Sequence, residues 1–306
     1  VGSVAEAVIA GRTFSIDFPT QNALQSALVG ISDVFVARLP LTGGPLVYST
    51  YLGGSSDDEA RGLTVDASGA PVVVGAAGSP DFPLQHAFQT RHGGNLDGFV
   101  VRLSPSGGAL AYSTYFGGAG VDAAVGVVLD AGGAAVLVGG TSSTDFPTQG
   151  AFQPNNAGGF DAFLARLPLS GAPPTHSTYL GGNLDDGAVG VAPDASGAAV
   201  VAGFTASADF PLQAAFQTAH GGAFDAFIAR FPRASGPPSC STYLGGAADD
   251  LAYKVAVDAS GDAVVAGLTR SADFPTRNAF QPRLAGLADD GLEVGDAAWG
   301  LSLIHI

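Results

Sequence analysis

The stretch Ser49-Thr50-Tyr51-Leu52-Gly53-Gly54 decides the fold, because it returns three more times at one unvarying interval. The later copies begin at Ser113, Ser177 and Ser241, so each lies 64 residues after the one before. A second marker, Asp-Phe-Pro, follows the same interval and begins at Asp17, Asp81, Asp145, Asp209 and Asp273. A fixed period of this kind is typical of an array of repeated supersecondary units. The sequence therefore predicts one unit copied along the chain without net insertion.

One repeat, taken as residues 33–96, holds four short apolar stretches separated by turn residues. Short stretches rich in valine, phenylalanine and tyrosine favour β-strands. Strands are expected at 33–39, 46–52, 60–65 and 71–75. Between the last two, Asp66-Ala67-Ser68-Gly69 is typical of a tight turn, because Asp can accept backbone hydrogen bonds and Gly can adopt a positive φ. We expect these four strands to form one antiparallel sheet, followed by a loop over 76–96 that carries Asp-Phe-Pro.

The fourth strand of each repeat is apolar on both sides. The copies are Val72-Val73-Val74, Val136-Leu137-Val138, Val200-Val201-Ala202 and Val264-Val265-Ala266. A strand without apolar and polar alternation belongs to a sheet that is covered on both faces. Four-stranded sheets stacked face to face provide that cover, and their radial stacking is the β-propeller. The predicted fold class is an all-β propeller of 64-residue, four-stranded antiparallel blades. A parallel β-helix is the alternative, but its coils are much shorter.

The repeats cover residues 1–283, and the pattern fails beyond them. The chain opens inside a repeat, because residues 7–11 align with 71–75. Asp289 falls in register with Asp225, but Asp290-Gly291-Leu292-Glu293 replaces the expected Ala-Phe-Ile-Ala. We expect a partial blade, about four full blades and another partial blade. The propeller is then an incomplete arc, and residues 284–306 are a divergent or non-native tail.

Composition narrows the classes of function. The 306 residues include 45 glycines, 46% are hydrophobic and 13% are charged, which suits many short strands and tight turns rather than helices or a disordered chain. The formal charge of −15 disfavours nucleic acid as a partner, because an acidic surface repels phosphate backbones. No segment is long and apolar enough to be expected as a membrane-spanning helix.

The repeated motifs resemble the SBBP family of bacterial β-propeller repeats. In one copy the similar elements are Asp97 to Leu103, Tyr112 to Gly118, Asp122, Leu129-Asp130, Val138-Gly139, Asp145-Phe146-Pro147 and Ala151-Phe152-Gln153. The resemblance implies a propeller of about seven blades in a large secreted or surface-attached bacterial protein. It therefore implies an extracellular or cell-surface location and further blades or domains in the parent protein. It implies no known catalytic residues.

The repeated acidic loops are the weak candidates for a metal site. Asp58, Asp122, Asp186 and Asp250 occupy one position of the repeat, and Asp57, Asp185 and Asp249 precede three of them. Calcium is the metal to consider, because it takes several oxygen ligands. The alternative is that these carboxylates cap loops or form ion pairs. We favour the alternative, because the calcium-binding Asp-x-Asp-x-Asp-Gly pattern is absent from the sequence.

Other polar residues are expected to be structural. Arg38, Arg102, Arg166 and Arg230 recur inside the first strand and should pair with a repeated carboxylate, and for Arg102 we expect Asp122 or Asp97. Histidines do not repeat, which disfavours a shared metal or acid–base site. The single cysteine, Cys240, stands where other repeats have Tyr or His, so we expect a partly buried, inert thiol.

The first functional expectation is a non-catalytic extracellular scaffold for adhesion, with a protein or glycan as its partner and no cofactor. Two alternatives remain, a carbohydrate-active hydrolase or lyase with its site at the propeller axis, and a calcium-stabilised spacer. An enzyme differs from a scaffold in one feature that the sequence can be searched for. Catalysis needs a few residues with unequal roles, so an enzyme should show a polar cluster that does not repeat.

Overall fold

The computed structural model describes residues 6–284 and the backbone of residues 304–305. Within these residues the chain forms strands and turns without a helix, and so has no helix that could cross a membrane. The strands are β1 (Glu6–Thr13), β2 (Asp33–Pro40), β3 (Tyr48–Leu52), β4 (Asp58–Val65), β5 (Pro71–Ala77), β6 (Asp97–Leu103), β7 (Leu110–Phe116), β8 (Asp122–Leu129), β9 (Ala135–Thr141), β10 (Asp161–Leu167), β11 (His176–Leu180), β12 (Asp186–Pro193), β13 (Ala199–Thr205), β14 (Asp225–Phe231), β15 (Cys240–Leu244), β16 (Asp250–Val257), β17 (Ala263–Thr269) and β18 (Ile304–His305).

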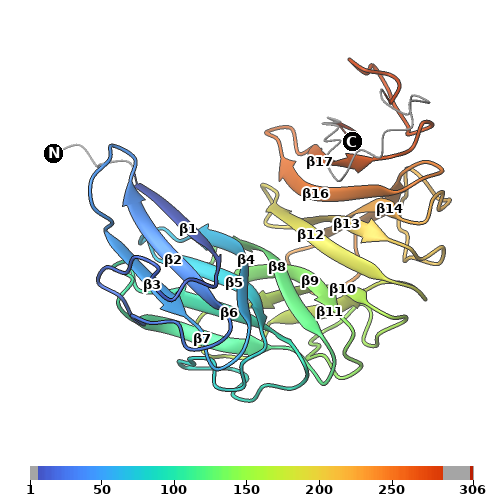
Figure 1. Cartoon of the computed structure of the whole chain (residues 1–306). Coiled ribbons are helices and arrows are strands. Elements are labelled where there is room, and N and C mark those ends of the chain that lie inside the picture. Colours follow the sequence, from blue (N-terminus) through green and yellow to red (C-terminus); the bar gives the residue numbers. More distant parts are fainter. Residues whose placement is uncertain (1–5, 285–303, 306) are drawn as a thin grey trace, which may run out of the picture. The chain divides into compact units, whose positions relative to one another are not determined.

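The strands form five sheets, and three of these have four strands in sequence order (Figure 1). The sheet orders are β1-β2-β3, β4-β5-β6-β7, β8-β9-β10-β11, β12-β13-β14-β15 and β16-β17-β18. The register is antiparallel, with Gly75 opposite Phe99 between β5 and β6, for example. The four sheets after the first therefore each begin with the strand that follows an acidic loop.

The expected grouping of strands within residues 33–96 is wrong. Strands β2 and β3 pair with β1, whereas β4 and β5 pair with β6 and β7. The long loop before β6 brings that strand alongside β5, while the short acidic loop after β3 leads the chain into the next sheet. The long loop also lies along the outer strand, where Gln85 pairs with Ser113 and Gln89 with Tyr115. These bridges cover an edge that would otherwise be free to pair with another chain.

By contacts, the chain divides into two compact units. Unit 1 comprises Val1–Gly150 and Phe163–Thr178, and unit 2 comprises Ala151–Ala162 and Tyr179–Ile306. In unit 1, β4 packs against β1 and β2, and β8 packs against β4, β5 and β6. In unit 2, β16 packs in the same way against β12, β13 and β14. Sheets therefore stack face to face within each unit.

Stacking explains why the central strands are apolar on both sides. Val72, Val73 and Val74 of β5 are all fully buried. The repeated four-stranded antiparallel sheets, stacked through their faces, confirm the predicted all-β propeller fold class. The number of blades and the closure of the ring stay predictions. The proposed tail at 284–306 lies outside the described residues, apart from residue 284 and the backbone of β18, which pairs with Val264 and Val265.

Candidate functional site

The four repeated aspartates of the acidic loops are buried inside the fold. Asp58, Asp122, Asp186 and Asp250 begin β4, β8, β12 and β16, and each is at most 1% exposed. Asp58 Oδ2 accepts hydrogen bonds from the Gly54 backbone N–H at 2.8 Å and from Ser79 Oγ at 2.7 Å. The same two donors recur at the other three positions. These carboxylates therefore tie the start of one sheet to the loop that precedes it.

The preceding aspartates have separate partners. Asp57 accepts a hydrogen bond from Ser32 Oγ at 2.9 Å, and Asp185 accepts one from the Phe160 backbone N–H at 3.0 Å. Asp249 forms an ion pair with Arg270 at 3.1 Å. Among the residues that the structure describes, no three acidic, His or Cys side chains gather as a metal-binding group. Calcium binding at the seven candidate aspartates stays a prediction.

A second buried aspartate lies beside each of the first, and the sequence interpretation missed its role. Asp33 begins β2 and is fully buried, and its Oδ2 accepts a hydrogen bond from Gln25 Nε2 at 2.6 Å. A Cβ atom at Gly53 would lie 2.4 Å from Asp33 Oδ1 and 2.9 Å from Asp58 Oδ2, so only glycine fits between the two carboxyl groups. Both Asp-x-Phe and Ala-Phe-Gln recur in the sequence, which was the available signal.

Burial changes how these carboxyl groups titrate. Removal from water raises the pKa of Asp58, Asp161 and Asp186 to about 6 each, although hydrogen bonds act in the opposite direction. Burial also raises the pKa values of Asp33, Asp97, Asp122 and Asp225. Because the arrangement repeats in successive sheets, we interpret these pairs as part of the framework rather than as a catalytic pair.

The arginines pair with carboxylates, but the partner expected for Arg102 is wrong. Arg102 Nη2 lies 2.5 Å from Asp66 Oδ2, not beside Asp122 or Asp97. Asp66 lies in the turn between β4 and β5, which belongs to the same sheet as Arg102 in β6. The corrected grouping of strands therefore accounts for the partner. Arg166 pairs with Asp130 at 3.3 Å, and Arg230 pairs with Asp194.

The first arginine departs from this pattern. Arg38 donates from Nη1 to the Pro105 carbonyl at 3.0 Å and from Nη2 to the Gly69 carbonyl, and its Nε lies 3.7 Å from Glu6. It therefore links β2 to two turns of the second sheet.

The Asp-Phe-Pro loops hold the long loops against the sheets. Phe82 is 2% exposed and stacks on Phe99 of β6, with ring centroids 4.9 Å apart. The Tyr115 hydroxyl accepts from the Phe82 backbone N–H at 3.1 Å and donates to the Ser79 carbonyl at 2.6 Å. Phe146 and Phe210 are buried in the same way. The phenylalanine of the motif is therefore a core residue in these three loops.

The described histidines and the cysteine do not gather into a metal-binding group of three or more side chains. His92 and His220 contact the carbonyls of Ala77 and Thr205 through Nε2, at 2.9 and 3.1 Å. His176 is 1% exposed, and burial lowers its pKa. Cys240 is partly buried, as expected, and burial raises the pKa of its thiol. A higher thiol pKa disfavours the reactive thiolate.

One polar cluster in unit 1 does not repeat. Glu59 of β4 lies between Arg12 of β1 and Arg61 of β4, and each guanidinium approaches Glu59 Oε2 at 3.6 Å. All three side chains are partly open to water, with exposed fractions of 36–42%. Arg12 also lies over the ring of Phe14 at 4.9 Å from its centroid. We call Arg12, Glu59 and Arg61 the Arg–Glu–Arg cluster.

A bulge in β4 places Arg61. The pairing with β5 shifts between Ala60 and Gly62, so Arg61 is the extra residue. Bulges re-aim side chains and occur often beside active sites. Strand β8 has the same bulge. Its pairing with β9 shifts between Ala124 and Gly126, so Val125 is the extra residue there. The chemistry of the cluster therefore comes from substitution at a bulge that the repeat already has.

Comparison with known proteins gives likeness in structure only. No family model and no curated protein matches the chain. A gluconolactonase from Xanthomonas campestris matches at a TM-score of 0.37 and 13% identity, over 76% of this chain and 65% of that one. The PQQ-bound form of an aldose sugar dehydrogenase from Streptomyces coelicolor matches at a TM-score of 0.37 and 12% identity. The match covers 88% of this chain and 80% of the dehydrogenase.

The expectation of a non-catalytic scaffold for adhesion is contradicted by this comparison, because both solved structures are of enzymes. Membership in the SBBP family stays a prediction. Since the likeness concerns the fold, only the residues of this chain can indicate its function.

Proposed function

We propose that the protein is a carbohydrate-active enzyme that acts on acidic sugars at the Arg–Glu–Arg cluster. The observation that carries this proposal is that the cluster stands outside the repeat. The positions equivalent to Glu59 are Ala123, Gly187 and Leu251, and those equivalent to Arg61 are Val125, Val189 and Tyr253. A framework role would recur at each copy, whereas a catalytic role is needed once.

The charges of the cluster suit a sugar that bears a carboxylate. Guanidinium groups recognise carboxylates through paired N–H donors. The ion pairs of Glu59 with Arg12 and Arg61 are long and half-exposed, and such pairs contribute little stability, so an anionic ligand can displace them. The rest of the protein is acidic, with a formal charge of −15 that repels anions at long range, so the two arginines would bind the sugar carboxylate by direct contact.

Elimination is the reaction that the cluster supports best. Arg12 and Arg61 would hold the sugar carboxylate and make the adjacent carbon more acidic, and Glu59 would remove the proton from that carbon. The electron pair of the broken C–H bond forms a carbon–carbon double bond as the glycosidic C–O bond breaks, and the departing oxygen takes a proton from water. Hydrolysis would need a second carboxylate across the bond, and the cluster contains one.

The experiment is an activity screen with matched variants. The chain is incubated with polymers of uronic acids and with neutral glucans, while unsaturated products are followed by ultraviolet absorbance and new reducing ends by colorimetry. We expect activity on an acidic polymer with an absorbance increase, and a loss of about 100-fold or more in Glu59→Gln, because general bases contribute at least this much.

Asp249→Asn serves as the control, since Asp249 and Arg270 form another exposed ion pair outside the cluster. Full activity in the control with loss in Glu59→Gln supports the proposal. Equal activity of Glu59→Gln and the unaltered chain would show that Glu59 is not the base. Activity confined to neutral glucans would contradict the assignment of acidic sugars.

A further inference from the structure

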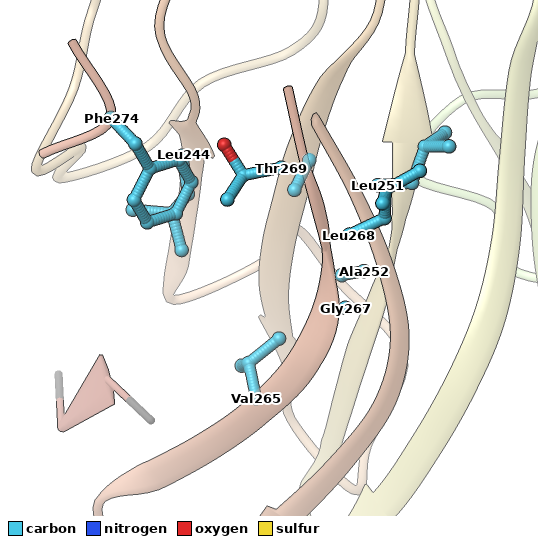
Figure 2. Close-up of a pocket in the computed structure, with 9 residues that line it drawn as sticks. Leu244, Leu251, Ala252, Val265, Gly267, Leu268, Thr269 and Phe274 are labelled. Carbon is cyan, nitrogen blue, oxygen red and sulfur yellow. The ribbon is translucent and has the colours of Figure 1, made fainter. Parts of the chain in front are cut away.

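The cavity in unit 2 that Figure 2 shows is too small to bind a sugar. Its volume is ≈ 20 Å³, which holds about one water molecule. Leu244, Val265 and Phe274 are among the apolar side chains that line it, so it offers few partners for the hydroxyl groups of a sugar. Contacts with a sugar beyond the Arg–Glu–Arg cluster are therefore expected at the surface that bears the cluster.

Phe14 is a large apolar residue at that surface. It directly follows β1 and is 60% exposed. Its equivalents in the later repeats are Gly78, Ser142, Ala206 and Arg270. Those of Arg12 are Ala76, Gly140, Phe204 and Leu268. An aromatic ring and a guanidinium group therefore occur together at these two positions only in the first sheet, so the pair is not part of the repeated framework.

The backbone that follows Phe14 is fixed to the first sheet. Ser15 donates from its backbone N–H to Thr13 Oγ1 at 3.1 Å. The Tyr51 hydroxyl donates to the Ser15 carbonyl at 2.7 Å and accepts from the Phe18 backbone N–H at 2.9 Å. The ring of Phe14 therefore extends into water from a segment that is already held, and a ligand that contacts it has little ordering of the backbone to induce.

The contact with Arg12 does not account for an exposed ring at this position. The Arg12 guanidinium lies over the ring, and the Arg12 side chain is itself 42% exposed. A cation–π contact between groups that both remain in water contributes little stability. An aromatic ring beside a few charged groups is, by contrast, typical of the lining of a ligand site.

The chemistry of a sugar chain fits this ring. The C–H groups on one face of a sugar carry partial positive charge, whereas the face of an aromatic ring carries partial negative charge, so the two faces attract each other. The Arg12 guanidinium lies 4.9 Å from the centroid of the Phe14 ring, which is about the length of one sugar unit. If Arg12 holds the carboxylate of one unit, Phe14 lies where the next unit of the chain would be.

We propose that Phe14 is the stacking surface for the sugar unit next to the one whose carboxylate Arg12 holds, and that it makes the site selective for chains of uronic acids over the single sugar. This inference rests on the proposed function, because it requires Arg12 to bind a sugar carboxylate. Phe14 determines specificity in this arrangement. It adds affinity for a chain and takes no part in the removal of the proton by Glu59.

The test compares the binding of galacturonic acid and of its linear trimer by isothermal titration calorimetry. The full chain carries Glu59→Gln throughout, so that the trimer is not consumed during the measurement. We expect the trimer to bind at least about 10-fold more tightly than the single sugar, because it adds a stacked ring. Phe14→Ala should remove most of this difference and leave the affinity for the single sugar unchanged within about twofold, whereas Phe14→Tyr, which keeps the ring, should retain the difference.

Phe216→Ala is the matched control, because Phe216 is 65% exposed and belongs to unit 2, and it should change neither affinity. An unchanged affinity for the trimer in Phe14→Ala would overturn the inference and leave the proposed function intact. Equal weakening of both sugars would also overturn it, since Phe14 would then only position Arg12. Failure of both sugars to bind would overturn this inference together with the assignment of acidic sugars. Binding of the trimer without elimination by the unaltered chain would contradict the proposed reaction alone.

Discussion

Buried carboxyl groups and Asp–Arg pairs make opposite contributions to the pH dependence of stability in this protein. Asp58 has no hydrogen-bond partner at Oδ1 among the described atoms, and burial raises its pKa to about 6. Asp66 is also subject to burial, but hydrogen bonds from Ser68, Arg102 and Ala70 outweigh it and lower its pKa to about 2. Asp58 therefore stabilises the folded state when it is protonated, whereas Asp66 does so when it is ionised.

Asp58→Asn should stabilise the protein at neutral pH. Because the folded pKa lies above the usual value of 3.8, the stabilising protonated form is fully present below pH 4 and is lost as pH rises through 6. Asn keeps an acceptor for Gly54 and Ser79 without the charge. We expect a gain of at most about 3 kcal/mol at pH 7.5 and almost none at pH 4, measured by urea unfolding. An equal loss of stability in Asp58→Asn at pH 7.5 and at pH 4 would contradict the predicted stabilisation.

Arg102→Ala should weaken the fold at pH 7 by about 1–2 kcal/mol, less than for a fully buried pair, because both side chains keep some access to water. The lowered pKa of Asp66 means that its contribution is present above pH 4 and is lost as pH falls through 2. The variant should therefore lose part of the acid dependence of unfolding. Arg270→Ala, which removes a more exposed pair, is the control and should change stability by less than about 0.5 kcal/mol. An equal effect of the two substitutions would show that pairing with Asp66 is unimportant.

Glycines at the centre of the sheets determine how closely the elements approach. A Cβ atom at Gly75 of β5 would lie 1.9 Å from the Glu59 carbonyl and 2.8 Å from Phe99. The backbone of the bulge in β4 occupies the space that a side chain would need, and the ring of β6 occupies the rest. No side chain therefore fits at position 75 while β4, β5 and β6 keep this spacing.

Gly75→Ala should cost about 3 kcal/mol or more, because relief of the contact requires a shift of backbone atoms. Gly108 provides the control, since a Cβ atom there would lie 3.6 Å from the nearest atom, in ordinary contact. Gly108→Ala should change the free energy of unfolding by less than about 0.5 kcal/mol. Thermal and urea unfolding of both variants would decide the matter, and a mild effect at Gly75 would indicate that β4 and β5 can separate locally.

The sequence predicted these strands but not their grouping, for a physical reason. A periodic sequence defines what one unit contains, yet any window of one period contains the same four strands. The choice of partner for β5 depends on the path of the long loop, which carries no apolar period of its own. The ion pair of Arg102 with Asp66 was missed for the same reason.

The Arg–Glu–Arg cluster could not be predicted from the repeat pattern, for a different physical reason. Arg12 and Glu59 are distant in sequence and meet only because β1 packs against β4. The available signal was the departure of these positions from the repeat, because the repeated residues themselves proved to be framework. In a repeat protein, exceptions to the pattern are the better guide to a site.

At the scale of the whole molecule, the internal partners of the carboxylates bear on calcium. Gly54 and Ser79 already donate to Asp58, and the same donors recur at the equivalent aspartates. A cation would have to displace these donors from a buried position. We therefore expect a chelator and added calcium to leave the melting temperature unchanged within error in scanning calorimetry. A rise of several degrees with calcium that disappears in Asp58→Asn would contradict this expectation.

A glycine at the same position of the repeat faces the next sheet in both units. A Cβ atom at Gly62 would lie 2.7 Å from the Val125 carbonyl, and one at Gly190 would lie 3.0 Å from the Val255 backbone nitrogen, each glycine facing the inner strand of the next sheet. Sheets that carry this glycine can therefore stack on the next sheet in the same way. Unequal recombination that adds or removes the DNA for one whole period would preserve the reading frame and every such junction. We expect related genes to differ in length by whole repeats, with breakpoints free to fall at any codon of the period.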